Sequence, residues 1–274
     1  KNNPLSNIAY TTHIPALIKK GIAIEHDAAP AGTVTFKDAN LEKAIRDALR
    51  IPTELLKKED LAGSEMLVYE GKGGAKISDL TGLEHCTSLT NLALKSNQLS
   101  DLSPLANLTN LTRLQLDDNQ LSDLSPLVNL ATGYLDLRSN QISDISALVE
   151  NTGISGKINL KDNPLNNTAL STHIPALEAR GIKVEYDIPG GVVLFKDVNL
   201  DKAIRDALGI PIELLKKEDL AKLTELEYTG FKLAENERIA DLTGLEFCSQ
   251  LIRLNLEGNQ DRKSTRLNSS HTSI

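Results

Sequence analysis

The sequence is poor in aromatic residues and in sulfur. Its 274 residues include no tryptophan, one methionine and two cysteines, and aromatic residues make up 3%. No run approaches the roughly 18 apolar residues that a membrane-spanning helix needs. The formal net charge of −7 argues against a nucleic-acid-binding protein, which usually carries a basic face. Because 40% of the residues are apolar but few are aromatic, the core must be aliphatic.

The residue types that usually carry catalysis form no recognisable site. No Cys/His cluster has the spacing of zinc ligands, and the glycines at 71–74 lack the spacing and the Lys-Ser/Thr pair of a phosphate-binding loop. Cys86 and Cys248 occupy matching contexts, EHCTSL and EFCSQL, and we interpret both as buried apolar side chains. We therefore predict that the protein is not an enzyme and uses no cofactor.

One column of carboxylates resembles a metal site. Stacked repeats would bring together four aspartates, namely Asp79, Asp101, Asp123 and Asp144. Each of them precedes a short predicted helix, where Asp is an ordinary cap, and no calcium-loop motif surrounds them. We interpret them as helix caps and predict no metal.

The clearest positive signal is a stretch that occurs twice. Residues 89–110 read LTNLALKSNQLSDLSPLANLTN, and residues 111–130 read LTRLQLDDNQLSDLSPLVNL. Both have the order L-x-x-L-x-L-x-x-N-x-L at a period of 22 residues, which is the pattern of a leucine-rich repeat. Leu92 and Leu94 alternate with Asn91, Ala93 and Lys95, so a short strand buries its leucines on one face.

A turn and a short helix follow each predicted strand. An inward asparagine amide can satisfy backbone groups that a buried turn would leave unpaired, so we interpret four equivalent residues as a structural ladder: Asn97, Asn119, Asn140 and Asn163. The following Asp-Leu-Ser-Pro-Leu has Ser as a natural N-cap and Pro at a favoured first helical position. It predicts a short 3₁₀ or α-helical turn.

A single coil of strand, turn and helix cannot bury its own leucines, so the coils must stack, each adding one parallel strand. The sequence therefore predicts an α/β solenoid. This is a leucine-rich repeat horseshoe with a parallel β-sheet on the concave face, 3₁₀ and short helices on the convex face, and helical N-terminal caps.

A second period of about 160 residues overlies the short one. Residues 36–62 recur almost unchanged at 195–221, and residues 3–27 recur at 163–187. We predict that 1–30 is the C-terminal cap of a preceding module, that 33–188 is a complete module and that 192–260 starts a further one. The complete module should contain a helical cap at 36–62, coils at 63–165, and a closing helix and strand at 166–187.

The caps should be helical because their apolar residues recur at helical spacing. Leu41, Ala44 and Ile45 lie on one face of a predicted helix, with Asp38 or Asn40 as its N-cap, and a second helix is expected at roughly 54–61. In the N-terminal fragment we expect a helix that Gly21 ends and a closing strand at 22–24.

The last fourteen residues, 261–274, fit no repeat. Residues 261–271 resemble the translation of a common sequencing adapter, and we interpret 261–274 as an artefact. Without them the chain has 27 basic and 36 acidic residues, a net charge of −9.

The coil consensus, the cap FKDANLEKAIRDAL and the segment ISDLTGLEHCTSL together resemble the bacterial, 22-residue class of leucine-rich repeat proteins, which includes the internalins. The resemblance covers residues 1–260. It implies the solenoid fold and, for function, binding of other molecules at a bacterial surface. The chain departs from internalin-type domains because short modules recur in tandem, with Ile-Pro-Gly-Gly at 188–191 between them.

The repeat also predicts where binding occurs, because solenoids bind on the concave face. The outward strand positions form three columns, which are Asn91, Arg113, Tyr134 and Lys157; Ala93, Gln115, Asp136, Asn159 and Lys183; and Lys95, Asp117, Arg138, Lys161 and Glu185. The plain alternative is a solvated sheet face of mixed charge. Interface hot spots favour Tyr, Trp and Arg, so Tyr134, Arg113 and Arg138 are the predicted anchors.

The leading hypothesis is protein binding, or glycan binding, by leucine-rich repeat modules in adhesion or recognition at a bacterial surface. An extracellular or surface location is favoured by the family resemblance. Two alternatives stay open, namely an intracellular scaffold that docks on an enzyme and a targeting arm of a larger enzyme. The expected partner is a protein, with no nucleic acid and no membrane span.

Overall fold

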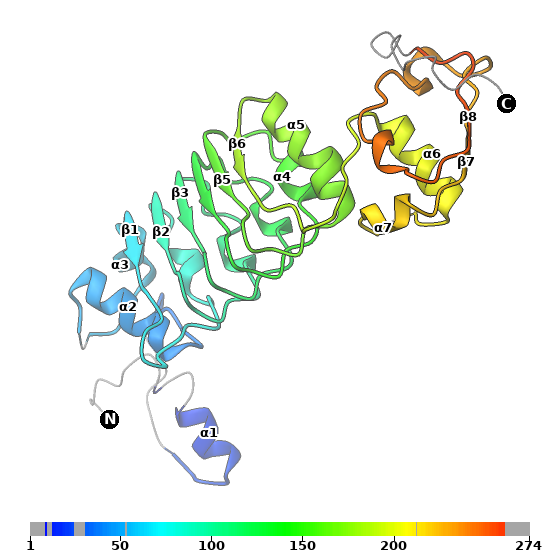
Figure 1. The fold of residues 1–274 in the computed structure, drawn as a ribbon. Coiled ribbons are helices and arrows are strands. Elements are labelled where there is room, and N and C mark those ends of the chain that lie inside the picture. The colour runs from blue at the N-terminus through cyan, green and yellow to red at the C-terminus, as the bar shows by residue number, and fades with distance from the viewer. Residues whose placement is uncertain (1–8, 10–12, 25–30, 53, 212, 261–274) are drawn as a thin grey trace, which may run out of the picture. The chain divides into compact units, whose positions relative to one another are not determined.

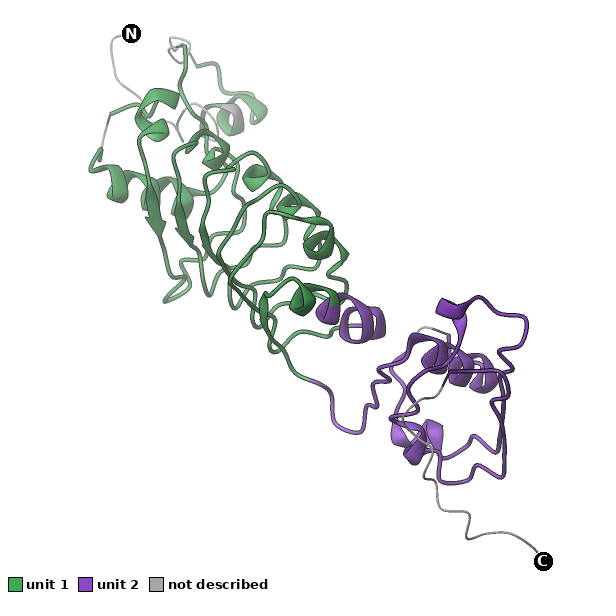
Figure 2. Cartoon of the chain, turned by 90° about the horizontal axis from the view of Figure 1, so that it is seen from above, with its two compact units in different colours: residues 1–165, 176–187 green, residues 166–175, 188–274 purple. Residues whose placement is uncertain are grey.

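The computed structural model describes residues 9, 13–24, 31–52, 54–211 and 213–260 (Figure 1). The chain divides into two compact units, residues 1–165 with 176–187 and residues 166–175 with 188–274 (Figure 2). The tandem-module organisation inferred from the sequence stays a prediction, and the tail at 261–274 lies outside the described residues. In the part of the chain that the structure describes, every helix is too short or too polar to cross a membrane.

Unit 1 is built around a parallel sheet of six strands in chain order. The strands have three residues each: β1 Met66–Val68, β2 Asn91–Ala93, β3 Arg113–Gln115, β4 Tyr134–Asp136, β5 Lys157–Asn159 and β6 Lys183–Glu185 (Figure 1). Their central residues align in one buried line: Leu67, Leu92, Leu114, Leu135, Ile158 and Val184. The predicted stacked solenoid with an aliphatic core is confirmed.

A left-handed residue and an asparagine follow the strands of the central coils. The residues before the ladder asparagines, Ser96, Asp118, Ser139 and Asp162, have φ between 55° and 59°. The Asn119 Oδ1 accepts a hydrogen bond from the Leu99 N–H at 3.0 Å, and its Nδ2 donates to the Leu94 and Leu116 carbonyls at 3.0 Å each. The equivalent side-chain oxygens of Asn97, Asn140 and Asn163 accept from Ile77, Leu121 and Ile142. Each of these amides therefore joins two adjacent coils.

Short helical turns lie between the strands. They are the 3₁₀ turns η2 Leu83–His85, η3 Ser103–Leu105 and η4 Ser125–Leu127, and the helix α4 Ser146–Glu150. The predicted Ser cap is wrong, because Ser103 is the first residue of its turn and the Asp101 Oδ1 accepts from its N–H at 2.8 Å. An aspartate two residues earlier reaches that N–H in a local side-chain turn, which leaves Ser inside the helix.

The helical cap of unit 1 consists of α2 Ala39–Leu49 and α3 Lys58–Ala62. Asp38 is the N-cap of α2, since its Oδ1 accepts from the Asn40 N–H at 2.9 Å. Its other oxygen accepts from the Ser78 N–H at 2.8 Å and so ties the cap to the first coil. The second helix begins later than predicted because Lys57 forms an antiparallel bridge with Thr33 and keeps the preceding chain extended.

The closing segment contains the π-helical η5 Ala169–His173, the helix α5 Ile174–Ala179 and then β6. Its N-terminal counterpart has the helix α1 Ile14–Lys19, but the strand predicted at 22–24 is absent from these described residues. The physical reason is hydrogen-bond pairing, because β6 bonds to β5, whereas no described strand pairs with residues 22–24.

Unit 2 repeats the cap and the first two coils. It contains α6 Val198–Leu208, α7 Lys217–Leu220, β7 Glu225–Glu227, η6 Glu235–Glu237, η7 Leu245–Phe247 and β8 Arg253–Asn255, with β7 and β8 parallel. Asn259 takes the ladder position, because its Oδ1 accepts from the Ile239 N–H at 2.9 Å. The same sequence pattern thus gives the same local structure twice.

Candidate binding face of the sheet

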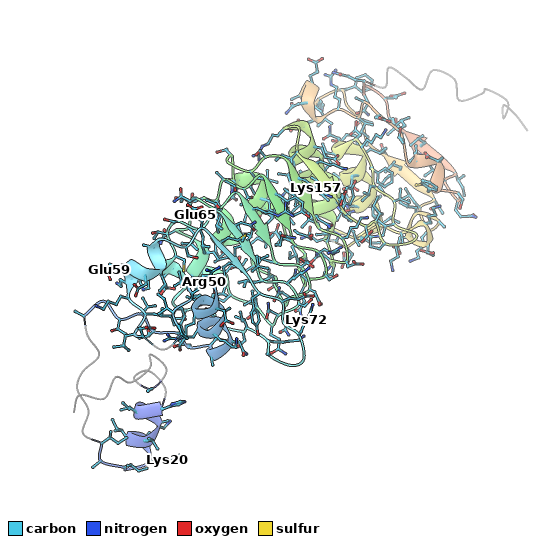
Figure 3. The ribbon with its side chains drawn as sticks, turned by 90° about the vertical axis from the view of Figure 1, so that its left-hand side faces the viewer. Lys20, Arg50, Glu59, Glu65, Lys72 and Lys157 are labelled. Carbon is cyan, nitrogen blue, oxygen red and sulfur yellow. The ribbon has the colours of Figure 1, made fainter. Side chains whose placement is uncertain are left out.

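The candidate site is the side of the unit 1 sheet that faces away from the leucine core, here called the sheet face. Its residues form three rows across the strands. The first row is Met66, Asn91, Arg113, Tyr134, Lys157 and Lys183; the second is Val68, Ala93, Gln115, Asp136, Asn159 and Glu185; and the third is Glu70, Lys95, Asp117, Arg138 and Lys161. Figure 3 shows the side chains over these strands, with Lys157 labelled.

The structure corrects the predicted columns at the last strand. Lys183 lies beside Lys157, not beside Asn159, and Glu185 lies beside Asn159, not beside Lys161. The closing strand β6 is not followed by a ladder asparagine from which its register could be counted, and a helix lengthens the connection that leads to it. The register of β6 therefore could not be taken from the 22-residue period.

The predicted binding residues differ in exposure. Arg113, Arg138 and Lys161 are exposed, whereas Asn91, Lys95, Gln115, Tyr134 and Lys157 are half-buried. Asp117, Asp136 and Asn159 are buried, with 8%, 4% and 6% of their surface exposed. These three residues therefore offer a partner little direct contact, and their polar atoms mainly contact neighbouring residues of the sheet face.

Arg138 lies over two of the buried groups. Its Nη2 is 3.2 Å from the Asp117 Oδ2 and 3.8 Å from the Asp136 Oδ2. The negative charge of Asp136 is the main cause that raises the pKa of Arg138, and the hydrogen bond to Asp117 adds to it. Two carboxylates thus hold this guanidinium in place on the sheet face.

Arg113 and Tyr134 form a stacked pair. The Arg113 guanidinium carbon lies 4.1 Å from the centre of the Tyr134 ring, and its Nε donates to the Gln115 Oε1 at 3.2 Å. The Tyr134 hydroxyl donates to the Asp136 Oδ2 at a longer 3.4 Å. All three predicted anchors, Arg113, Tyr134 and Arg138, are therefore held by contacts within the sheet face.

Lys157 and Glu185 form a second polar contact, with the Nζ 2.9 Å from the Oε2. This hydrogen bond raises the pKa of Lys157 and lowers the pKa of Glu185. Lys183 approaches the other Glu185 oxygen at 3.6 Å. One carboxylate therefore serves two ammonium groups at this end of the sheet face.

The sheet face is basic on an acidic chain. Its rows contain six basic and four acidic side chains, a net charge of +2, whereas the whole chain has a net charge of −7. At the β1 end the face is apolar, because Met66 and Val68 are 58% and 60% exposed. The columns predicted from the sequence begin at residues 91–95 and omit this apolar patch, although alternation with the inward Leu67 places both residues outward.

The other residues considered from sequence have local structural roles. The oxygens of Asp79, Asp101, Asp123 and Asp144 accept hydrogen bonds from the backbone two residues later. Among the described residues no group of three or more His, Cys, Asp or Glu side chains is placed to hold a metal ion. Cys86 and Cys248 are buried as unpaired thiols, and burial raises the pKa of Cys86 to about 12.

Comparison with known proteins agrees with this geometry. Residues 87–129 match a family model for leucine-rich repeats in two copies. Leucine-rich repeats form this solenoid. The leucine-rich repeat prediction is thereby confirmed, and a search of curated proteins finds no match.

Similar solved structures include two internalins of Listeria monocytogenes. An internalin (inlF) is 23% identical over 82% of this chain and 70% of its own, with a TM-score of 0.46. Internalin C2 (inlC2) is 21% identical over 84% of this chain and 99% of its own, with a TM-score of 0.43. The CBM51-2 and INT domains of Clostridium perfringens ZmpB are 23% identical over 41% of this chain and 23% of their own, with a TM-score of 0.27.

Proposed function

We propose that the sheet face of unit 1 binds a partner protein and that the chain is a non-enzymatic recognition module. The leucine-rich repeat fold supports binding of this kind, since solenoids present an extended surface built from variable positions on a constant frame. The observation that carries the proposal comes from the two copies of the cap and first coils within the chain.

The two copies are alike in the core and different on the sheet face. Five core-facing strand and turn positions are identical, namely Leu67, Tyr69, Leu92, Leu94 and Asn97 against Leu226, Tyr228, Leu254, Leu256 and Asn259. All six outward positions differ, namely Met66, Val68, Glu70, Asn91, Ala93 and Lys95 against Glu225, Glu227, Thr229, Arg253, Asn255 and Glu257. An apolar, neutral patch in one copy is therefore acidic in the other.

The surface of the helical cap, in contrast, is largely retained between the two copies. Among the described residues between 36 and 61 in the unit 1 cap, eleven are exposed, and nine of these are identical in unit 2. Exposed cap residues such as Lys43, Asp47 and Glu59 are retained as Lys202, Asp206 and Glu218, while the sheet face changes completely. Exposed coil positions outside the sheet face also differ, for example Gly63 and Thr87 against Lys222 and Ser249. The support for different binding partners is therefore a divergent coil surface, which includes every compared sheet-face position, beside a retained cap surface.

For location, we propose a bacterial surface or the extracellular space, with a role in adhesion or recognition. The support for this finer statement is the repeat consensus and cap sequence that resemble internalin-like proteins.

The proposal is tested by selecting peptides from a random phage-displayed library on the whole chain. Most independent binders should lose at least about fivefold in affinity when Tyr134→Ala and Arg138→Ala are combined, because each is placed as a hot spot. Lys43→Ala, an exposed cap change, is the matched control and should leave binding unchanged. If most binders tolerate the double change, the sheet face is not the preferred binding surface and the proposal fails.

A further inference from the structure

We propose that the sheet face recognises an acidic segment of its partner protein, and that Arg113 is the residue that clamps a partner carboxylate. This inference rests on the proposed function and names the chemistry of the partner. Three observations support it, namely the geometry of Arg113, two lysines of the sheet face that form no ion pair with a described residue, and the charge contrast between the sheet face and the chain.

Arg113 is held ready for a bidentate contact. Its guanidinium lies over the Tyr134 ring at 4.1 Å, and its Nε is engaged by the Gln115 Oε1 at 3.2 Å. The two terminal amino groups make no hydrogen bond or ion pair with any residue that the structure describes, and the residue is exposed. Two parallel N–H groups of one guanidinium match the two oxygens of a carboxylate. Because stacking already restricts the side chain, less conformational entropy is lost when a ligand binds.

Arg113 differs from Arg138 in the side chains that surround its guanidinium group. Arg138 has Asp117 and Asp136 within 4.0 Å, so its charge is compensated inside the sheet face. Arg113 has an aromatic ring and a neutral amide as neighbours instead. A carboxylate supplied by a partner would therefore complete the site around Arg113 and would have to compete with existing acids at Arg138.

Two further cations of the sheet face form no ion pair with a carboxylate of the described residues. Within the described residues, Lys95 and Lys161 have no Asp or Glu oxygen within 4.0 Å, whereas Lys157 is paired with Glu185. Both belong to the third row, and their charges help to lower the pKa of Glu70 and of Glu185, respectively, without forming an ion pair with them. An acidic peptide segment is attracted by such an array, and the attraction also speeds its association.

The same face does not suit nucleic acid. Binding to a phosphate backbone depends on many Lys and Arg contacts in a continuous basic surface. Here Asp117, Asp136 and Glu185 lie between the cations, which gives discrete sites for single carboxylates. A protein segment with spaced Asp or Glu residues matches this pattern.

The test uses the peptides recovered on the whole chain that are sensitive to Tyr134→Ala. These peptides should be enriched in Asp and Glu relative to the input library. Replacing the critical Asp or Glu by Asn or Gln should weaken binding about tenfold or more, as expected for a charge-assisted bidentate contact. Arg113→Lys should show most of this loss because it keeps the charge but not the fork, and Tyr134→Phe should keep affinity because the ring remains.

A double-mutant cycle identifies the contact. If Arg113 clamps the carboxylate, the Asn or Gln peptide should bind Arg113→Ala and the unmodified chain with similar affinity. Lys43→Ala and circular dichroism control for charge loss and folding. Peptides that are sensitive to Tyr134→Ala but need no carboxylate would overturn this inference, while the proposed function would stand. Tighter binding of a short DNA duplex or of a neutral oligosaccharide than of the acidic peptides would also overturn it. If no recovered peptide depends on Tyr134, the proposed function itself fails.

Discussion

Replacement of Asn119 by Ala should destabilise the solenoid strongly although it removes only one small side chain. The amide is 8% exposed and satisfies the Leu99 N–H and the Leu94 carbonyl, each at 3.0 Å, across two coils. A buried backbone group left without its partner costs roughly 1–3 kcal/mol, so the two together should cost about 2–6 kcal/mol. For a unit of this size that loss lowers the melting temperature by roughly 4–24 °C.

The assay is urea denaturation followed by far-ultraviolet circular dichroism, with Asn107→Ala as the matched control. Asn107 is an exposed asparagine of the preceding coil, and its replacement should change the free energy of unfolding by less than about 0.5 kcal/mol. A loss below about 1 kcal/mol for Asn119→Ala would refute the reasoning, because the buried backbone groups would then have another source of hydrogen bonds.

Three further predictions concern the scaffold. Asp38→Ala removes the cap of α2 and the bond to Ser78, so it should lower the free energy of unfolding by about 1–3 kcal/mol in the same urea assay, and an equal effect of Asp47→Ala would contradict this. The pKa of Glu185 is lowered in the folded state, so the contribution of this side chain to stability is present at neutral pH and is lost as pH falls through that pKa. The midpoints of urea denaturation of Glu185→Gln and of the unmodified chain should therefore differ at pH 7 and converge at pH 3. Cys86 should react with a thiol reagent only after denaturation, because burial raises its pKa to about 12, and rapid native-state labelling at this residue would be inconsistent with its packing.

The fold was predictable because its determinants are periodic. Leucines at fixed phase determine the strands, and an asparagine after each strand marks the turn. The helical cap followed from Leu41 and Ile45 at helical spacing with Asp38 before them. Two local predictions failed. An extended pairing with Thr33 delays the second cap helix, and the Asp101 side chain accepts from the Ser103 N–H in a local turn, which leaves Ser103 inside the short helix.

The sequence predicted which residues lie on the sheet face, but it did not predict the contacts that these residues make with one another. Alternation along the strands places Arg113, Tyr134 and Arg138 outward, as found. The burial of Asp117 and Asp136 depends on how Arg138 folds back over them, which strand periodicity does not describe. The same limit applies to the stacking of Arg113 on Tyr134, since it depends on rotamers of neighbouring strands.

The central claim is that a partner docks on the sheet face, and site-directed photocrosslinking tests it most directly. A photoreactive amino acid at Lys161, an exposed outward position, should couple to a peptide recovered in the selection. The same amino acid at Asn107, in the turn after η3, should not couple to it. Coupling at 107 with none at 161 would contradict the proposed binding face.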